Sequence, residues 1–302
     1  MMRKLFISFW LCLFAFSAFP QNILLISSRK VPFFAKVVDG VKDYISENIA
    51  TASTDVVYSD DGDILNKAVS KKYDVICALG VSDAKKIISH VKDIPVVFTL
   101  VIDPVKNGLV DSLAPSGKNI TGVTLAFPVA SELEMVRKVM PGIKTIGMLY
   151  GGASEDVYNG LKQLDVRVKG VKVSGATQVP SAISEFNHGD VDAVWLVMDT
   201  EVYDKDSLSF TLNHCSERKI PVIGFASNTV KAGALMGFVY DYNDLGRQTG
   251  EVVGSIIKGK NAGEIPIAPP RKVGYSINKR IANYMGIDIP SAITGSAVET
   301  FE

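Results

Sequence analysis

The chain has 302 residues, 47% of them hydrophobic and 21% charged, and its 32 basic and 32 acidic residues leave no net formal charge. This composition is typical of a globular protein, and the length suits two domains of ordinary size. The balanced charge lacks the basic excess of nucleic-acid-binding proteins, so we expect no nucleic-acid partner.

The first predicted element is an export signal over residues 1–20. Arg3 and Lys4 form a short basic region before an apolar run from Leu5 to Phe19. That run of roughly 15 residues is short for a membrane span and typical of a secretory signal. We therefore expect an exported, periplasmic protein. The alternative is that the segment stays uncut and tethers the protein to the membrane.

Strand-like runs then alternate with amphipathic helices. Strands that are apolar throughout and lie between helices indicate a parallel sheet covered on both faces, so we predict a doubly wound α/β lobe. Its elements in chain order are the strand "NILLIS", a helix from Ala35, the strand "DVVYS", the helix "DILNKAVSKK", the strand "DVICAL", the helix "DAKKIISHV" and the strand "PVVFTLV".

Phe33 and Phe34 precede the predicted helix, whose apolar stripe begins at Val37, so we place both rings in the loop after the first strand. Two roles suit adjacent aromatics at this position. One ring could stack on a flat ligand at the rim of a cleft, while the other packs the helix start into the core. We expect one ring in each role.

The same order of elements restarts after "NITGVTL", which predicts a second doubly wound lobe. The two halves also share a plan, since "YDVICALGVSDA" and "KDIPVVFTLVIDP" correspond to "VDAVWLVMDTEV" and "RKIPVIGFASNT". We therefore expect a pseudo-symmetric pair of lobes in preference to one large sheet. After the helix within "DYNDLGRQTGEVVGSIIKGK", Pro269 and Pro270 can continue neither helix nor central strand, which indicates a link that crosses between bodies.

Motifs for catalysis or metal binding are scarce. His90, His188 and His214 are scattered, and none is paired with Cys or carboxylate at metal-ligand spacing, so we expect no metal. We expect no cofactor either. Because no nucleophile motif or acid–base pair stands out, we predict a binding protein and not an enzyme.

The candidate site is the set of loops at the carboxyl ends of the predicted strands, where open α/β sheets bind ligands. Each loop precedes a helix, so amide groups and the positive helix end point toward a ligand. The candidate ligand-binding residues lie in these loops, at strand ends or at crossovers: Ser28, Phe33, Phe34, Gly80, Ser82, Asp103, Thr121, Tyr150, Asp199, Thr200, Ser227, Asn228 and Asp241.

Three of these residues suggest specific roles. Asp199 ends a buried strand, where an unpaired carboxylate is costly; a ligand ammonium or sugar hydroxyl would satisfy it, and capping of the next helix is the alternative. Ser82 and nearby amides could receive a ligand carboxylate. Asp103, before Pro104, could instead fix a turn through hydrogen bonds to the backbone.

From about Asn22 to its end, the chain resembles the periplasmic substrate-binding proteins of ABC transporters, in the ABC substrate-binding family that includes tryptophan-binding members. The resemblance is carried by the blocks "IPVVFTLVIDPVKNGLVDSLAPSGKNITGVT", "ELEMVRKVMPGIKTIGMLY", "KIPVIGFASNTVKAGALMGFVYDYNDLGRQTGEVVGSIIKGKNAGEIPI" and "MGIDIP".

The resemblance implies the type I periplasmic binding protein fold, with two Rossmann-like lobes joined by three crossovers and a ligand cleft between them. We expect an N-terminal lobe of residues 21–124 plus about 241–270, and a C-terminal lobe of residues 125–240 plus about 271–302. The implied partners are a small solute and a membrane permease with its ATPase, and we expect a monomer.

The family favours an amino acid, in particular an aromatic one, as the ligand. One stretch departs from the family pattern, because "VPFFAKVVDGV" is closer to the first loop of ribose-type sugar binders. A sugar or nucleoside is therefore the alternative ligand. A periplasmic sensor that reports to a membrane receptor is the alternative role.

Overall fold

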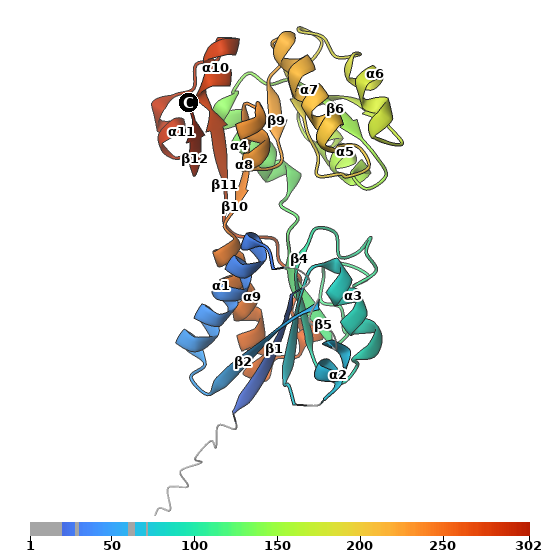
Figure 1. Ribbon diagram of the computed structural model, residues 1–302, viewed down its shortest axis with the longest axis vertical. Helices are drawn as coiled ribbons and strands as arrows, with labels where there is room; N and C mark the ends of the chain where they lie inside the picture. The colour runs from blue at the N-terminus through green and yellow to red at the C-terminus, as the bar shows by residue number, and fades with distance from the viewer. Residues whose placement is uncertain (1–19, 28–29, 60–63, 71) are drawn as a thin grey trace, which may run out of the picture.

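The computed structural model describes residues 20–27, 30–59, 64–70 and 72–302, which form two α/β lobes stacked along the long axis of the molecule (Figure 1). We call the body built on the first sheet the N-terminal lobe and the body built on the second sheet the C-terminal lobe. Residues 1–19 of the predicted export signal, and Ser28, lie outside the described residues. No helix in the described ranges is long and apolar enough to cross a membrane.

The N-terminal lobe contains a five-stranded parallel sheet in the order β2-β1-β3-β4-β5. Alternate residues of β1 reach different cores: Ile23 and Leu25 pack into one cluster, and Leu24 and Ile26 pack into another on the opposite face. A strand buried on both faces must be apolar throughout, which explains "NILLIS". The strands are β1 (Gln21–Ser27), β2 (Ala52–Tyr58), β3 (Val75–Leu79), β4 (Val96–Val101) and β5 (Ile120–Thr124).

Helices cover both faces of this sheet. The helices α1 (Pro32–Asn48) and α9 (Tyr242–Ile257) pack against one face, and α2 (Ile64–Val69) and α3 (Val81–His90) pack against the other. Helices α1 and α9 approach each other at glycines: a Cβ atom on Gly246 would lie 2.2 Å from the Val37 carbonyl oxygen. Segments about 200 residues apart in the sequence are therefore in direct backbone contact.

Helix α1 begins at Pro32, earlier than the predicted start at Ala35. Proline suits the first position of a helix, because its missing amide hydrogen would have no helical partner there. Phe33 and Phe34 consequently lie on the first helical turn and not in a loop, which corrects the prediction from the sequence.

The C-terminal lobe contains a seven-stranded sheet in the order β12-β11-β10-β9-β8-β6-β7. Its strands are β6 (Thr145–Tyr150), β7 (Arg167–Lys172), β8 (Ala193–Trp195), β9 (Val222–Gly224), β10 (Met236–Tyr240), β11 (Val273–Asn278) and β12 (Glu299–Phe301). Its helices are α4 (Val129–Val139), α5 (Glu155–Lys162), α6 (Val179–Ile183), α7 (Lys205–Glu217), α8 (Ser227–Ala232), α10 (Lys279–Met285) and α11 (Ser291–Gly295), and short 3₁₀ turns lie at η2 (Ala176–Gln178) and η3 (Ala262–Glu264).

The prediction of an α/β protein with a parallel sheet in each of two lobes is confirmed, with one refinement. Strand β11 runs antiparallel to β10, and β12 follows the direction of β11. The reason lies in the chain path, because β11 enters the C-terminal lobe from the N-terminal lobe, at the end of the sheet where β10 finishes. Strand β11 therefore starts at the end of the sheet where β10 stops, and it runs in the opposite direction to β10.

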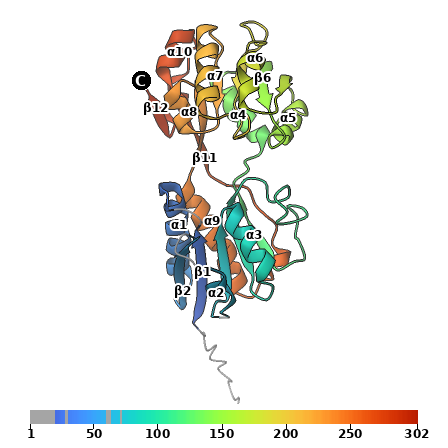
Figure 2. The same ribbon diagram turned by 45° about the vertical axis from the view of Figure 1, so that its right-hand side comes forward.

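Among the described residues, the chain passes between the two sheets three times: from β5 to α4, from β10 to α9, and from η3 to β11 (Figure 2). The third passage is fixed to the N-terminal lobe by α9. The Arg271 guanidinium donates to both oxygens of Asp244, at 2.9 and 3.1 Å, and Lys272 lies 3.0 Å from the same carboxylate. Gln248 donates to the Pro269 carbonyl oxygen at 2.8 Å.

Candidate ligand-binding cleft

The carboxyl ends of the parallel strands in the two lobes face each other across a cleft. Strand β5 ends where the chain leaves for the C-terminal lobe, and β10 ends where the chain leaves for the N-terminal lobe. Because the neighbouring parallel strands share these directions, the loops that follow them converge on the same space. Open α/β sheets bind ligands at such ends.

A cavity of about 150 Å³ lies where the C-terminal lobe borders this cleft, and it reaches the first passage of the chain between the lobes. Two rings in its wall, Trp195 and Phe238, are only 2% and 3% exposed, and their centroids lie 5.9 Å apart. We call it the aromatic pocket. It is lined by Ile102, Leu125, Ala126, Phe127, Val129, Glu132, Ala153, Ser154, Val157, Trp195, Leu196, Val197, Met198, Phe225, Phe238 and Tyr240.

Glu132 places a carboxyl group in the wall of the aromatic pocket, from the first turn of α4. Within the described part of the chain, this carboxyl group has neither a hydrogen bond nor an ion pair with another side chain. Its side chain is partly exposed toward the cleft, but apolar and aromatic groups surround most of it. Burial raises the pKa of the Glu132 carboxyl to about 8, although the positive end of α4 favours the charged form.

Tyr240 is the second titratable group in the pocket wall, at the end of β10. Burial, and secondarily the neighbouring Glu132, raise the pKa of the Tyr240 hydroxyl well above its ordinary range. The two groups therefore favour their neutral forms at neutral pH when no ligand is bound.

Asp199 lies behind the pocket wall and holds two loops together. Its Oδ2 atom accepts a hydrogen bond from the Ser154 hydroxyl at 2.7 Å, and its Oδ1 atom accepts one from the Glu201 amide at 3.0 Å. The Ser154 hydroxyl in turn accepts from the Gly151 amide at 3.0 Å. Both carboxylate oxygens of this 4%-exposed side chain are thus satisfied by the protein itself. Thr200, the next residue, is exposed.

Phe33 and Phe34 divide between the surface and the core. Phe34 is 7% exposed and belongs to the core of the N-terminal lobe, whereas Phe33 is 39% exposed. The Phe33 ring packs 5.3 Å from the ring of Tyr242, the first residue of α9, which follows the second passage between the lobes. An exposed aromatic surface therefore lies beside the passage, on the N-terminal lobe.

The remaining candidates of the N-terminal lobe have mainly structural contacts. Gly80 caps α3 with a φ angle of +93°, a conformation that glycine accommodates without strain, and Ser82 is exposed on the first turn of that helix. Asp103 accepts hydrogen bonds from the amides of Val105 and Lys106, at 3.1 and 2.9 Å, and so fixes the turn after β4.

Thr121 is fully buried near the amino end of β5, at the opposite end of the strand from the cleft, and its hydroxyl donates to the Ile265 carbonyl oxygen at 2.8 Å. The structure places it away from the other candidates. Asp241 caps α9 by accepting from the Asp244 amide at 2.9 Å.

The other candidates of the C-terminal lobe lie at strand ends. Tyr150 ends β6, and its ring stacks on that of Tyr158 with centroids 4.1 Å apart. Ser227 donates to the Glu299 carboxylate, and Asn228 is exposed beside it. These side chains do not line the aromatic pocket.

The pocket residues were therefore missed by reasoning from the sequence. Trp195 lies in "DAVWLVM", which shows only a buried strand, and Glu132 lies beside Glu134 in a helix whose charged positions indicate a solvated face. The structure ends β8 (Ala193–Trp195) at Trp195, whereas the predicted strand runs on to Met198, so the position of Trp195 at a strand end was not visible in the sequence. No pattern in the sequence distinguished Glu132 from Glu134.

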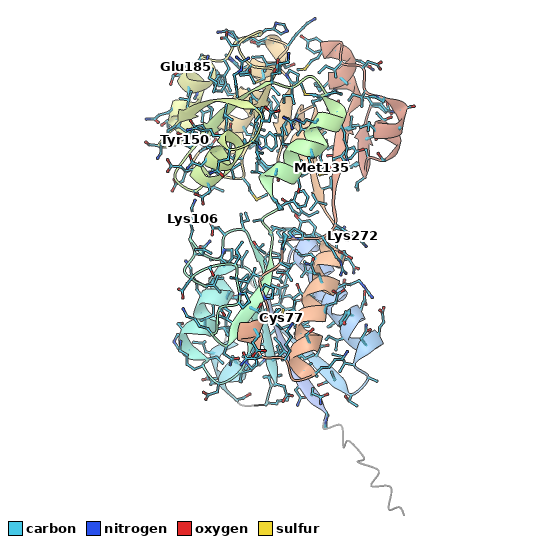
Figure 3. All side chains as sticks on the ribbon, turned by 180° about the vertical axis from the view of Figure 1, so that it is seen from behind. Cys77, Lys106, Met135, Tyr150, Glu185 and Lys272 are labelled. Carbon is cyan, nitrogen blue, oxygen red and sulfur yellow. The ribbon has the colours of Figure 1, made fainter. Side chains whose placement is uncertain are left out.

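One ion pair spans the cleft. The Lys106 ammonium group, on the loop after β4, lies 2.5 Å from the Asp156 carboxylate on α5. It also donates to the Ala153 carbonyl oxygen at 3.5 Å, and Ala153 lines the aromatic pocket. Figure 3 shows Lys106 at the edge of the N-terminal lobe that faces the C-terminal lobe, opposite Lys272 at the third passage.

A larger, shallower depression of about 630 Å³ lies at the far side of the C-terminal lobe, beside α10 and α11. It is lined by side chains near the surface, such as Lys279 and Asp288. The described residues that line it do not include the loops that follow the parallel strands. Within the described ranges, no group of three or more His, Cys, Asp or Glu residues could hold a metal ion.

Two lobes, three passages and a cleft at the strand ends define a two-lobed solute-binding protein of the periplasmic type. The sequence model described as "ABC transporter substrate binding protein" matches residues 34–301, and the chain belongs to this family. The resemblance seen in the sequence is thereby confirmed. The family is one of binding proteins, as predicted, and not of enzymes.

The chain is similar to the "Tyrosine-binding protein" of Clostridioides difficile (strain R20291), with 30% identity over 223 residues. That match covers 72% of this chain and 64% of the relative, so it spans less than two thirds of the relative's length.

Two solved structures show the same fold. The ligand-free, open structure of a substrate-binding protein with adhesive properties from Clostridium difficile is 25% identical and superposes with a TM-score of 0.80, over 93% of this chain and 100% of that one. An ABC domain from Streptococcus pneumonia in complex with L-Trp is 24% identical, with a TM-score of 0.66 over 93% and 99% of the two chains.

Proposed function

We propose that this protein captures a small solute outside the cytoplasm and delivers it to the permease and ATPase of an ABC importer. The observation that carries the proposal is the aromatic pocket, which opens on a cleft between two lobes joined by three passages. Such a geometry buries a ligand when the lobes approach, and the closed form then offers the permease one defined surface. The apolar segment at the start of the sequence supports export, by a cleaved signal or by a membrane tether.

The solute that we propose is an amino acid with an aromatic side chain. Trp195 and Phe238 offer ring surfaces for stacking in a pocket lined mostly by apolar side chains. Glu132 offers the negative partner that a ligand ammonium requires. The names of the tyrosine-binding relative and of the L-Trp complex support the same class of solute for this chain.

The conformation described here is the open one in this proposal. It superposes well on a ligand-free, open relative, with a TM-score of 0.80. Closure would turn the lobes about the three passages and bring the strand ends together around the solute. Arg271 and Lys272 would keep the third passage attached to α9 during that movement.

The test is a thermal-shift screen of the purified protein with the twenty common amino acids, several pentoses and hexoses, and nucleosides. A ligand that binds only the folded state raises the melting temperature by mass action, by the equivalent of about 2.7 kcal/mol at a hundredfold excess over Kd. We expect the largest shifts with L-tyrosine or L-tryptophan. A shift with sugars alone would contradict the proposed solute class.

A sugar or nucleoside is the second candidate, and one observation favours it. Phe33 exposes its ring beside the passage between the lobes, where it could stack on the apolar face of a sugar ring. The thermal-shift screen separates the two candidates directly. If a sugar binds, Phe33→Ala should weaken its binding, and Phe210→Ala, which removes a similarly exposed ring from α7, should not.

A further inference from the structure

We propose that Glu132 is the residue by which the aromatic pocket selects a ligand carrying a protonated amine, and that each such ligand expels one proton from the pocket as it binds. This inference rests on the proposed function and specifies the chemistry of its site. In the empty pocket the Glu132 carboxyl is protonated. When the ammonium group of a ligand approaches, the carboxyl O–H bond breaks, the proton leaves to the solvent, and the carboxylate pairs with the unchanged ammonium.

The first support is the composition of the pocket wall. Among the described residues that line it, Glu132 alone carries an ionisable carboxyl group, and Tyr240 is the other titratable side chain. The described residues that line the pocket include no lysine, arginine or histidine. A positive group brought by the ligand would therefore be the closest partner available to Glu132.

The second support is the surroundings of the pocket. Lys106 reaches the rim at Ala153 but is paired with Asp156, and Asp199 lies behind Ser154 with both of its oxygens accepting hydrogen bonds. These charges are already compensated by the protein. Glu132 is not, since no described donor contacts its carboxyl group.

The third support is the aromatic lining. The faces of Trp195, Phe238 and Tyr240 carry negative electrostatic potential and attract cations, most strongly where water is excluded. The same lining makes an isolated carboxylate unfavourable, because its charge loses hydration. The lining therefore disfavours an unpaired carboxylate at Glu132 and favours an ammonium group beside it.

The fourth support is the titration behaviour of this residue. Burial raises the pKa of the Glu132 carboxyl to about 8, so it carries a proton at neutral pH in the empty pocket. An adjacent positive charge favours the ionised carboxylate and lowers its pKa. Binding at neutral pH consequently releases close to one proton, and binding well above the raised pKa releases none.

The test is isothermal titration calorimetry of the whole protein in pairs of buffers with different ionisation enthalpies, which yields the number of protons released. The probes are L-tyrosine, L-tryptophan, tyramine, which keeps the amine but lacks the carboxylate, and 3-(4-hydroxyphenyl)propionate, which lacks the amine. Near neutral pH we expect L-tyrosine and L-tryptophan to release close to one proton each. We expect tyramine to bind and the deaminated acid to bind at least tenfold more weakly than L-tyrosine.

Two variants complete the design. Glu132→Gln should weaken L-tyrosine binding at least tenfold and abolish proton release. The control is Glu134→Gln, two residues further along α4 on its exposed face, which should change neither the affinity nor the proton release. Glu132→Gln is expected to fold, because it removes a carboxyl group that is costly to bury, and its thermal melting confirms this independently of binding.

The outcomes separate this inference from the proposed function. Tight L-tyrosine binding by Glu132→Gln with unchanged proton release would overturn the role of Glu132 and leave the amino-acid-binding function intact. Equal affinity for the deaminated acid, or binding of sugars alone, would overturn the selection for an amine. Failure of every solute in the thermal-shift screen would instead overturn the proposed function.

Discussion

Lys106 of the N-terminal lobe and Asp156 of the C-terminal lobe form an ion pair of 2.5 Å across the cleft. Both side chains are substantially exposed, so the pair adds little to the stability of either lobe. Its importance is positional. It joins the two lobes on the side of the molecule opposite the third passage at Lys272 (Figure 3).

We predict that Lys106→Met widens the unliganded protein, because methionine keeps the apolar part of the side chain but cannot pair with Asp156. Small-angle X-ray scattering should show a larger radius of gyration for the variant than for the wild type. Added salt screens the ion pair, so the radius of gyration of the wild type should then rise toward that of the variant. The ligand dissociation rate should rise by about twofold to fivefold, as expected for the loss of an exposed ion pair. A more compact variant would contradict this role, and Lys138→Met, an exposed change on α4, is the control.

The pH dependence of stability should report Glu132. Between the ordinary glutamate pKa of 4.5 and the raised value of about 8, the folded protein keeps a proton that the unfolded chain has released. This contribution to stability is complete below the lower value and is lost as the pH rises through the higher one.

We therefore predict that Glu132→Gln raises the melting temperature of the unliganded protein by a few degrees near pH 8 and by much less near pH 5. Thermal melts of both proteins across this range check the prediction. If the difference between the variant and the wild type is the same at both ends of the range, the carboxyl group of Glu132 is not desolvated as described.

Trp195 should report the occupancy of the pocket by fluorescence. The sequence holds two tryptophans, Trp10 within the predicted signal and Trp195, so a chain that begins at Pro20 keeps Trp195 alone and all described residues. L-tyrosine added under excitation selective for tryptophan should shift or quench this emission with the same Kd as calorimetry gives. An unchanged spectrum at saturation would place the ligand away from the pocket.

The contact between α1 and α9 should be intolerant of added volume. A Cβ atom on Gly246 would meet the backbone of Val37 at 2.2 Å, so Gly246→Ala should force the helices apart and lower the free energy of unfolding by about 1 to 3 kcal/mol. Gly142→Ala is the matched control, because nothing lies within 4 Å of its added Cβ atom. Chemical denaturation measures both, and equal stabilities would contradict the tight packing.

The adjacent phenylalanines should behave differently. Phe34→Ala removes a buried ring and should lower the free energy of unfolding by about 3 kcal/mol. Phe33→Ala removes an exposed ring and should lower it by less than about 1 kcal/mol. Denaturant titrations of the two variants check this contrast, which would fail if both changes cost the same.

The sequence was most informative where one local pattern determines one feature. The apolar run of β1 is buried on both faces, and this pattern alone indicates a covered parallel sheet. The early start of α1 at Pro32 was missed because the apolar stripe of a helix does not show where its first turn lies. The reversed direction of β11 depends on the passage between the lobes and not on any property of its own residues.

The site was harder to predict, because the aromatic pocket combines residues from several separate elements. Trp195 and Phe238 come from strands β8 and β10, and Glu132 comes from α4, more than sixty residues before Trp195. Each side chain looks ordinary in its own element. Only the tertiary arrangement brings the carboxyl group and the rings together.

Closure of the two lobes around a solute is the claim on which the whole account depends. Dyes attached at Lys86→Cys on α3 and Gln163→Cys at the end of α5 would report the distance between the lobes, since Cys77 and Cys215 are buried and burial raises the pKa of each thiol to about 12. Single-molecule energy transfer should show one longer distance in the unliganded protein and a shorter one when L-tyrosine saturates it. A distance that stays the same with every solute that stabilises the protein would contradict closure.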